Sequence, residues 1–339
     1  MRIRERLLVL LVGLVMVASA WPARAGAAEP YEGKTLTIMV GFPAGGGYDR
    51  MARLVARHLP KHIPGQPTVI VQNMTGGASV VLANQLYNVA RPDGLTIGTF
   101  ARNLSIAQLL RVEGVRFDLT RFAWVASMAS EPTVLTVRGD LPFRTVEDLR
   151  KAREPVIFAA SGPGDTSHDY PLLLKAYLGL NLKLVAGYKG GPPAILAVER
   201  NEAHGFASSF TGLKPHIDRG LLRPLIRARA VAPGIEKLPF DEELATTALA
   251  RKVLAMRSST EVAGRPFAAP PGTPADRLAI LQSAFEKVAK DPEAIAEAAK
   301  GQMDFDFLAG LAVLRHVTDT LQAPPDVVEE FKKYMSFGR

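Results

Sequence analysis

The sequence predicts an α/β protein whose two domains face each other across a cleft. Its 339 residues exceed what one small hydrophobic core needs and suit two domains. Two strand–helix–strand units occur along the chain, each with a loop of small residues between its first strand and its helix. An extended apolar stretch, residues 122–137, separates the units and can carry the chain from one domain into the other.

The N-terminal segment has the pattern of a secretory signal peptide. Arg2, Arg4 and Arg6 precede the mostly apolar residues 7–18, and small-residue cleavage sites follow at residues 23–27. A membrane anchor would need about 18 or more consecutive apolar residues. We therefore predict that residues 1–27 are a cleaved signal peptide that exports the protein.

The composition limits the cellular compartments and the classes of partner that we expect for this protein. The chain has no cysteine, which removes disulfides, thiolate catalysis and cysteine metal sites together. An exported protein of two domains without disulfides fits the bacterial periplasm. The net charge of +8 comes from basic residues scattered along the chain without a run of five, so we expect no nucleic-acid partner.

The first strand–helix–strand unit begins the first domain. Its pattern predicts a strand over residues 36–40, a glycine-rich loop over 41–47 and a helix near 48–59. A second strand over residues 68–72 and a polar, glycine-bearing loop over 73–79 complete the unit. Three consecutive glycines between a strand and a helix indicate that something approaches the backbone closely.

The second unit repeats this order. It predicts a strand over residues 156–160, a loop over 161–167, a helix near 168–178, a strand over 182–186 and a loop over 187–191. Ligands of parallel α/β sheets bind beyond the carboxyl ends of the strands. We therefore expect the loops of the two units to border one shared cleft.

The remaining segments complete the two domains. Thr145 is a predicted helix N-cap, with Asp148 three residues on, and Thr273 precedes a long helix that runs to residue 290. Further helices are expected near 79–88, 193–200, 213–219, 292–300, 308–321 and 326–334, and further strands over 96–100, 203–207, 223–228 and 266–269.

These elements give a division of the chain into two lobes. Residues 28–125 and 266–339 are expected to form lobe 1, and residues 126–265 to form lobe 2. The "PFAA" stretch at 266–269 returns the chain to lobe 1, where the last three helices would pack behind the sheet.

The glycine loops do not match three common enzyme motifs. A P-loop requires Lys followed by Ser or Thr after the last glycine, but Tyr48 and Asp49 follow here. A dinucleotide site requires an acidic residue at the end of the second strand, where Gln72 and Asn73 stand. A nucleophile elbow, G-x-S-x-G, does not occur.

The polar residues of these loops suit an anion more than a reaction. A loop that opens a helix offers unpaired N–H groups and the positive end of the helix dipole. Asp49 is best explained as a helix cap, whereas Ser161, Thr166 and Ser167 fit capping and ligand binding equally. A surface or capping role is favoured for His168, and Lys189 is either solvated or paired with an acidic ligand.

The same loops contain no nucleophile–base pair, carboxylate dyad or metal-ligand set. The glycines of the first loop could alone make only a tight turn, but the second loop repeats the arrangement. We therefore expect a site that holds an anion without changing it, with no catalytic residue, metal or cofactor.

Seven motifs in order resemble those of a known family, the periplasmic solute receptors of tripartite tricarboxylate transporters, also called Bug proteins. The resemblance covers residues 31–334. The motifs read "LTIMVGFPAGGGYDRMAR", "PTVIVQNMTGGAS", "ARPDGLTIGT", "SGPGDTSHDY", "GYKGGPPAILAVERNE", "KPHIDRGLLRPL" and "APPGTPADRL".

The resemblance implies a two-lobed fold of the type II periplasmic-binding-protein or Venus flytrap kind, in which each lobe is a mixed sheet flanked by helices. It also implies that the loops after the first strand of each unit grip a carboxylate. Carried over by position, the implied ligand-binding residues are Phe42, Ala44, Gly46, Tyr48, Asp49, Gly77 and Ser79 on one lobe, and Ser161, Gly164, Thr166, Ser167, His168, Tyr188 and Lys189 on the other.

The sequence departs from the family pattern at two positions in or near this set, Tyr48 and Ser208. Tyr48 stands where many relatives have Thr, so the pocket is expected to be tighter or more aromatic. Ser208 lies in the segment where many relatives carry Asp, which weakens the case for an amino-acid ligand. We include Ser208 among the candidate ligand-binding residues.

The resemblance implies a monomeric periplasmic receptor that captures a small organic carboxylate and delivers it to membrane transporter subunits. Two alternatives remain open at this stage. One is a receptor that feeds a sensory kinase, and the other is an exported enzyme that acts on a carboxylated substrate.

Overall fold

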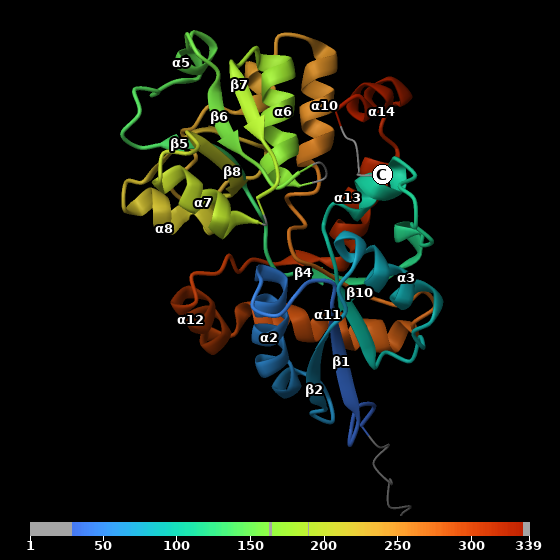
Figure 1. The fold of residues 1–339 in the computed structure, drawn as a ribbon. Coiled ribbons are helices and arrows are strands. Elements are labelled where there is room, and N and C mark those ends of the chain that lie inside the picture. Colours follow the sequence, from blue (N-terminus) through green and yellow to red (C-terminus); the bar gives the residue numbers. More distant parts are fainter. Residues whose placement is uncertain (1–28, 163–164, 189, 335–339) are drawn as a thin grey trace, which may run out of the picture.

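The computed structural model describes residues 29–162, 165–188 and 190–334, which form two β-sheets with helices on both faces (Figure 1). The predicted signal peptide, residues 1–27, lies outside the described residues. Within these residues no helix combines the length and the apolar character that crossing a bilayer requires.

The first sheet has six strands in the order β11-β4-β10-β3-β1-β2. β1 pairs in parallel with β2 and β3, whereas β10 pairs antiparallel with β3 and β4, and β11 antiparallel with β4. The strands are β1 Thr35–Val40, β2 Thr68–Asn73, β3 Thr96–Thr99, β4 Ala123–Ser127, β10 Pro266–Ala269 and β11 Leu308–Ala309.

Helices cover both faces of this sheet because side chains alternate along its strands. Ile38 of β1 packs into a core with Leu54 and Phe285, whereas its neighbour Met39 packs on the other face with Leu82 and Val313. These elements form the first lobe. Its helices are α2 Gly47–His58, α3 Val80–Asn88, α4 Leu104–Leu109, α11 Ala275–Lys290, α12 Pro292–Lys300 and α13 Gly310–Leu321, with 3-10 turns Pro60–His62, Gly77–Ser79 and Leu119–Arg121.

The second sheet has five strands in the order β7-β6-β8-β5-β9. β6 pairs in parallel with β7 and β8, and β5 pairs antiparallel with β8 and β9. The strands are β5 Thr133–Arg138, β6 Val156–Ala159, β7 Leu182–Val185, β8 Gly205–Ser209 and β9 Leu222–Arg227. Two mixed sheets flanked by helices confirm the predicted fold class.

The second lobe consists of this sheet and the helices on its two faces. Leu135 of β5 packs with α6 and α10 on one face, and its neighbour Val134 packs with α7 and α8 on the other. The predicted capping box of Thr145 and Asp148 starts α5. The helices are α5 Val146–Arg150, α6 Thr166–Leu178, α7 Gly191–Glu199, α8 Phe210–Asp218, α9 Asp241–Leu244, α10 Ala248–Ser258 and α14 Pro325–Lys332.

The last helix, α14, differs from the sequence-based expectation that residues 326–334 pack behind the first sheet. Val327, Val328 and Phe331 are buried in the core of the second lobe, in one cluster with Leu254 of α10. Figure 1 shows α14 on the side of α10. The physical reason is that α10 presents an apolar face that α14 covers. The chain therefore crosses to the second lobe once more near its end.

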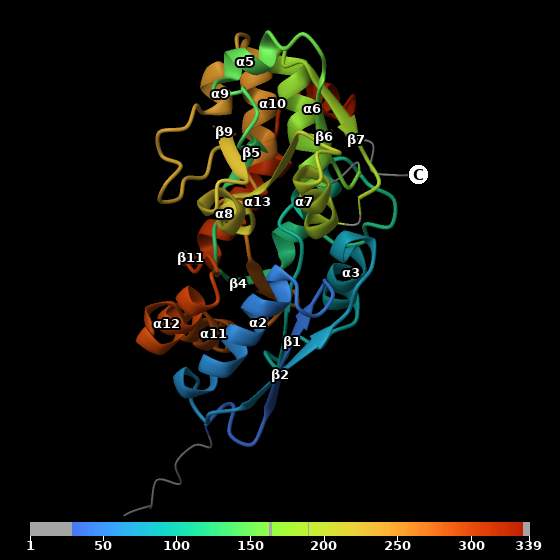
Figure 2. The same ribbon diagram turned by 60° about the vertical axis from the view of Figure 1, so that its left-hand side comes forward.

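The chain passes between the lobes at residues 128–132, 259–265 and 322–324. We call the first two the crossing segments. Figure 2 shows the second lobe, with α7 and α8, above α2 and α3 of the first. The crossing segments are joined by backbone hydrogen bonds, from Glu131 N–H to the Glu261 carbonyl (2.8 Å) and from Met128 N–H to the Arg265 carbonyl (3.0 Å).

Gly264 allows the crossing segments to approach this closely. A Cβ at this position would lie 2.8 Å from both the backbone nitrogen and the Cγ of Glu131. Real Cβ atoms do not approach backbone atoms so closely, so a side chain would push the segments apart.

We predict that Gly264→Ala lowers the free energy of unfolding by about 1–3 kcal/mol because of this overlap. Gly191→Ala is the matched control, since a Cβ there would meet the Phe206 ring at 3.9 Å, an ordinary contact. The control should change stability by less than about 0.5 kcal/mol. Urea denaturation of both variants measures the difference, and equal stabilities would contradict the prediction.

Candidate functional site

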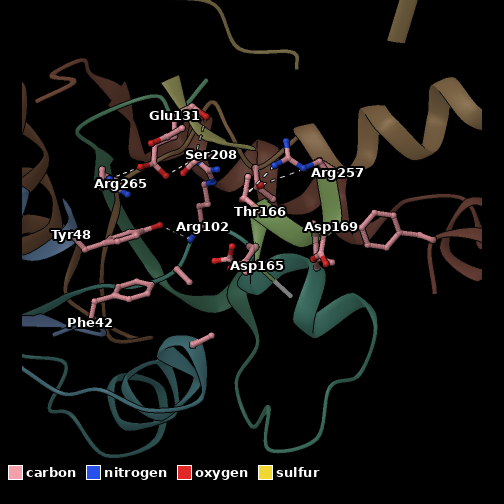
Figure 3. Close-up of a pocket in the computed structure, with 17 residues that line it drawn as sticks. Phe42, Tyr48, Arg102, Glu131, Asp165, Thr166, Asp169, Ser208, Arg257 and Arg265 are labelled. Carbon is pink, nitrogen blue, oxygen red and sulfur yellow. Dashed lines mark hydrogen bonds and ion pairs between the residues drawn. The ribbon is translucent and has the colours of Figure 1, made fainter. Parts of the chain in front are cut away.

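A cavity of about 340 Å³ lies between the two lobes, and side chains of both lobes and both crossing segments line it (Figure 3). Phe42 follows β1, Arg102 follows β3, Thr166 follows β6 and Ser208 lies in the last residues of β8. The carboxyl ends of parallel strands therefore border the cavity from both sides, as expected from the repeated strand–helix–strand units.

Aromatic rings form one wall of the cavity. The Phe42 and Tyr48 rings are stacked, with centroids 4.3 Å apart, and the Arg265 guanidinium lies 4.2 Å from the Tyr48 centroid on the ring face. The Tyr48 hydroxyl accepts a hydrogen bond from the backbone N–H of Arg102 (3.0 Å). Burial, and then the nearby Glu131 carboxylate, raise the pKa of Tyr48, so the ring stays neutral.

Two arginines of the cavity share one carboxylate. Arg102 and Arg265 each form an ion pair with a different oxygen of Glu131. Burial lowers the pKa of Arg102, but the neighbouring acidic groups, Glu131 foremost, together outweigh it, so the pKa is raised. Two cations and one anion leave one positive charge in excess on this Arg102–Glu131–Arg265 cluster.

A third arginine, Arg257 of α10, reaches the cavity from the second lobe. Its guanidinium pairs with Glu261 and donates to the Thr133 hydroxyl (3.2 Å) and the Thr166 hydroxyl (3.4 Å). It also lies over the Tyr170 ring, 4.6 Å from the centroid. Because Glu261 balances its charge, Arg257 positions Thr166 without adding net charge.

Carboxylates and hydroxyls at the start of α6 form the opposite wall. Asp165 and Asp169 line the cavity. Asp165 caps the helix by accepting from the Ser167 N–H (2.9 Å), while the Ser167 hydroxyl accepts from the Ser161 N–H (2.9 Å). His168 Nδ1 lies 2.9 Å from an oxygen of Asp169. Much of this wall is already hydrogen-bonded within the protein.

Of the residues carried over by position, four line the cavity: Phe42, Tyr48, Thr166 and Ser208. Gly77 lines a neighbouring groove instead. The remaining described positions do not line the cavity; these are Ala44, Gly46, Asp49, Ser79, Ser161, Ser167, His168 and Tyr188. Gly164 and Lys189 lie outside the described residues.

Several of these residues hold the loops rather than face the cavity. The buried Ser79 hydroxyl donates to the Gly41 carbonyl (3.2 Å), which fixes the two loops of the first unit against each other. Ser167 bonds within its own loop, as described above. Tyr188 packs at the edge of the second-lobe core.

Asp49 is the main support of the glycine-rich loop. Its carboxylate accepts from the Gly45 N–H (2.8 Å), from Arg53 (2.9 Å) and from Asn73 (2.8 Å). Burial alone would raise the pKa of Asp49, but these hydrogen bonds outweigh it and lower the pKa to about 2. Asp49 lies in the first turn of α2 and bonds to the loop before the helix, whose N-cap is Gly46 without a side-chain cap, so it holds the loop rather than capping the helix as expected.

Sequence reasoning missed the charged residues of the cavity, namely Arg102, Glu131, Asp165, Asp169, Arg257 and Arg265. Arg102 could have been found, because it follows a predicted strand of the first sheet at the same edge as the glycine loop. Glu131, Arg257 and Arg265 lie in no sequence motif that marks a binding site. Only the tertiary packing of the crossing segments and α10 brings them to the cavity.

A group of metal-binding residue types lies away from the cavity. His58, Asp291 and Glu293 have ligand atoms within 4.8 Å of one another. The Lys61 ammonium sits 2.6 Å from Asp291 and 2.5 Å from Glu293. A cation of the protein itself thus occupies the position that a metal ion would take, and the group ties α2 to α12.

We predict that Asp49→Asn lowers the free energy of unfolding by about 2 kcal/mol at pH 7, since the depressed pKa measures how much the fold favours the carboxylate. The stabilisation is complete above the unfolded-state pKa near 4 and is lost as the pH falls towards 2. The two proteins should therefore converge in stability at low pH.

Chemical denaturation at pH 7 and near pH 3 measures this difference. Asp218→Asn is a control that removes an exposed pair with Lys214 and should cost less than about 0.5 kcal/mol at either pH. A difference for Asp49→Asn that did not depend on pH would contradict the prediction.

Comparison with known proteins agrees with the fold. The chain is 27% identical over 290 residues to a protein encoded in the tcbD-tcbE intergenic region of Pseudomonas sp. (strain P51), covering 84% of this chain and 82% of that protein. The structure of R. palustris Rpa4515 with adipate matches with a TM-score of 0.67, 22% identity, and coverage of 92% and 98%.

The structure of MatC from Rhodopseudomonas palustris with bound malate matches with a TM-score of 0.64 and 20% identity, covering 87% of this chain and 99% of that one. These identities establish a shared fold. The family model TctC, described as the tripartite tricarboxylate transporter family receptor, matches residues 51–332. This confirms the resemblance noted in the sequence, and the chain belongs to the TctC family of tripartite tricarboxylate transporter receptors.

Proposed function

We propose that this protein is a periplasmic receptor that binds a small organic carboxylate in the cavity between its lobes and delivers it to a tripartite tricarboxylate-type membrane transporter. Membership of the receptor family supports a solute-binding role. The observation that carries the proposal is the Arg102–Glu131–Arg265 cluster, which places one excess positive charge at a cavity between the lobes.

The guanidinium groups of Arg102 and Arg265 decide which ligands this part of the cavity favours. A carboxylate removed from water without partners is strongly destabilised, so the site must supply charge-assisted hydrogen bonds. Each such bond contributes about 1.5–3 kcal/mol. Arg102 and Arg265 retain N–H groups beyond those that Glu131 accepts, because each guanidinium has five. A ligand carboxylate can therefore join this cluster without displacing Glu131.

The donors come from both lobes. Arg102 and Tyr48 belong to the first lobe, whereas Thr166 and Ser208 belong to the second. Micromolar binding requires about 8 kcal/mol of net free energy, more than one or two hydrogen bonds supply after the cost of association. We infer that the ligand is held by both lobes together, so that binding favours the closed arrangement.

The size of the cavity supports a small ligand. About 340 Å³ lies at the lower end of the usual range for ligand sites. Solved structures of the same fold are described with malate and with adipate. Both are compact organic acids, and we propose the same ligand class here.

Periplasmic location and transport rest on two observations. The first residues have the pattern of a signal peptide, and the family model is that of a transporter receptor. The alternative partner is a sensory kinase in place of a membrane transporter.

The enzymatic alternative predicts that the bound acid is converted to a product. Incubation of the protein with the acid, followed by mass spectrometry, tests this, since a receptor returns its ligand unchanged.

A thermal-shift screen over mono-, di- and tricarboxylates tests the ligand class, because a ligand that binds the native form raises the melting temperature. We expect at least one small carboxylate to do so. A screen in which no carboxylate shifts the transition would overturn the proposed function.

We predict that Arg102→Gln weakens binding of the best carboxylate about 10- to 100-fold, the equivalent of one charge-assisted hydrogen bond. Thr166→Ala should weaken it less, because a neutral hydroxyl is lost. Isothermal titration calorimetry measures both. Arg219→Gln, which removes an exposed partner of Glu199 outside the cavity, is the control. Unchanged affinity in Arg102→Gln would place the carboxylate elsewhere.

A further inference from the structure

A second hollow lies next to the cavity, on the surface of the first lobe. It is a groove of about 1100 Å³ between α3, α4 and the loop of residues 112–116. Ala78, Asn103 and Asp165 line both this groove and the cavity between the lobes. The two spaces therefore adjoin at these three residues.

Most of the surface area that the groove presents is apolar. Val80 and Val81 of α3, Leu104 and Ala107 of α4, and Val112 line it. Val81 is 46% exposed, although valine is usually buried. The groove thus leaves apolar surface in water that an apolar ligand segment would cover.

Two amide side chains in the groove, Asn84 and Asn88, already have partners within the protein. Asn84 donates to the Gly114 carbonyl (2.8 Å) and accepts from the Arg116 N–H (2.8 Å). Asn88 donates to the Arg116 carbonyl (2.9 Å). These bonds hold the 112–116 loop against α3, so the two amides shape the groove and do not need a polar ligand.

The charges beside the groove do not select a second charged group. Glu113, Arg116 and Asp165 border it, so acidic groups outnumber basic ones there and a second carboxylate is disfavoured. The cavity, in contrast, presents the guanidinium groups of Arg102 and Arg265. A ligand matched to both spaces has one carboxylate and an uncharged apolar chain.

We propose that the receptor accepts monocarboxylates whose apolar chain leaves the cavity past Ala78 and lies in the groove between α3 and α4. This inference rests on the proposed function, because it places the carboxylate in the arginine-lined cavity. It goes further by assigning a binding site for the rest of the ligand and by naming its chemical class.

Calorimetric titration with hexanoate, octanoate and decanoate tests the assignment. Each methylene buried in the groove should lower the dissociation constant by up to about fourfold. We expect decanoate to bind at least about tenfold more tightly than hexanoate, because only part of the added chain will be covered.

Val81→Glu is the diagnostic variant, since it places a charge on the exposed apolar wall. It should remove the gain with chain length and leave hexanoate binding unchanged. Ile295→Glu is the matched control, because Ile295 of α12 is 47% exposed and lines neither space. If Val81→Glu does not melt cooperatively, Val89→Glu replaces it, as Val89 is 64% exposed and borders the same groove.

The outcomes separate this inference from the proposed function. If hexanoate, malate or adipate binds but a longer chain adds no affinity, the groove assignment is wrong and the receptor function stands. A chain-length gain that Val81→Glu leaves intact also overturns the assignment, because the chain then lies elsewhere. If none of these acids binds and no carboxylate raises the melting temperature, both proposals fail.

Discussion

The shared carboxylate of Glu131 is the interaction on which the site depends. Glu131 lies in the first crossing segment, Arg265 lies in the second, and Arg102 follows β3 of the first lobe. Without this carboxylate, two guanidinium groups would lie close together and largely buried, which is strongly unfavourable. The same ion pairs therefore hold the connections between the lobes and set the charge of the cavity.

This arrangement links ligand recognition to the crossing segments that join the two lobes. Arg265 covers one face of Tyr48, and Phe42 covers the other, so the aromatic wall is ordered by a residue of the second crossing segment. On the opposite side, Glu261 of that segment neutralises Arg257, which positions Thr166. A shift of the crossing segments would alter both walls at once, and this coupling suits a receptor that closes on its ligand.

The sequence predicted the elements with strong local patterns. The first strand was expected over residues 36–40 and is Thr35–Val40, and the strand expected over 156–160 is Val156–Ala159. The family resemblance nominated Phe42 and Tyr48, and both the loop pattern and the resemblance nominated Thr166; all three line the cavity. Glu131 and Arg265 were missed because only tertiary packing brings them together. The sequence analysis assigned α14 to the first lobe, whereas it packs on the second, because the pattern of a short amphipathic helix does not specify what it packs against.

The contacts of α14 and β10 bear on when the protein can fold. The first sheet is incomplete without β10 and β11, and the core of the second lobe lacks Val327 and Phe331 until α14 is present. Neither lobe is therefore complete until a segment beyond residue 307 has been synthesised, β11 for the first lobe and α14 for the second. In the export proposed above, this late completion keeps the chain unfolded and able to cross the membrane.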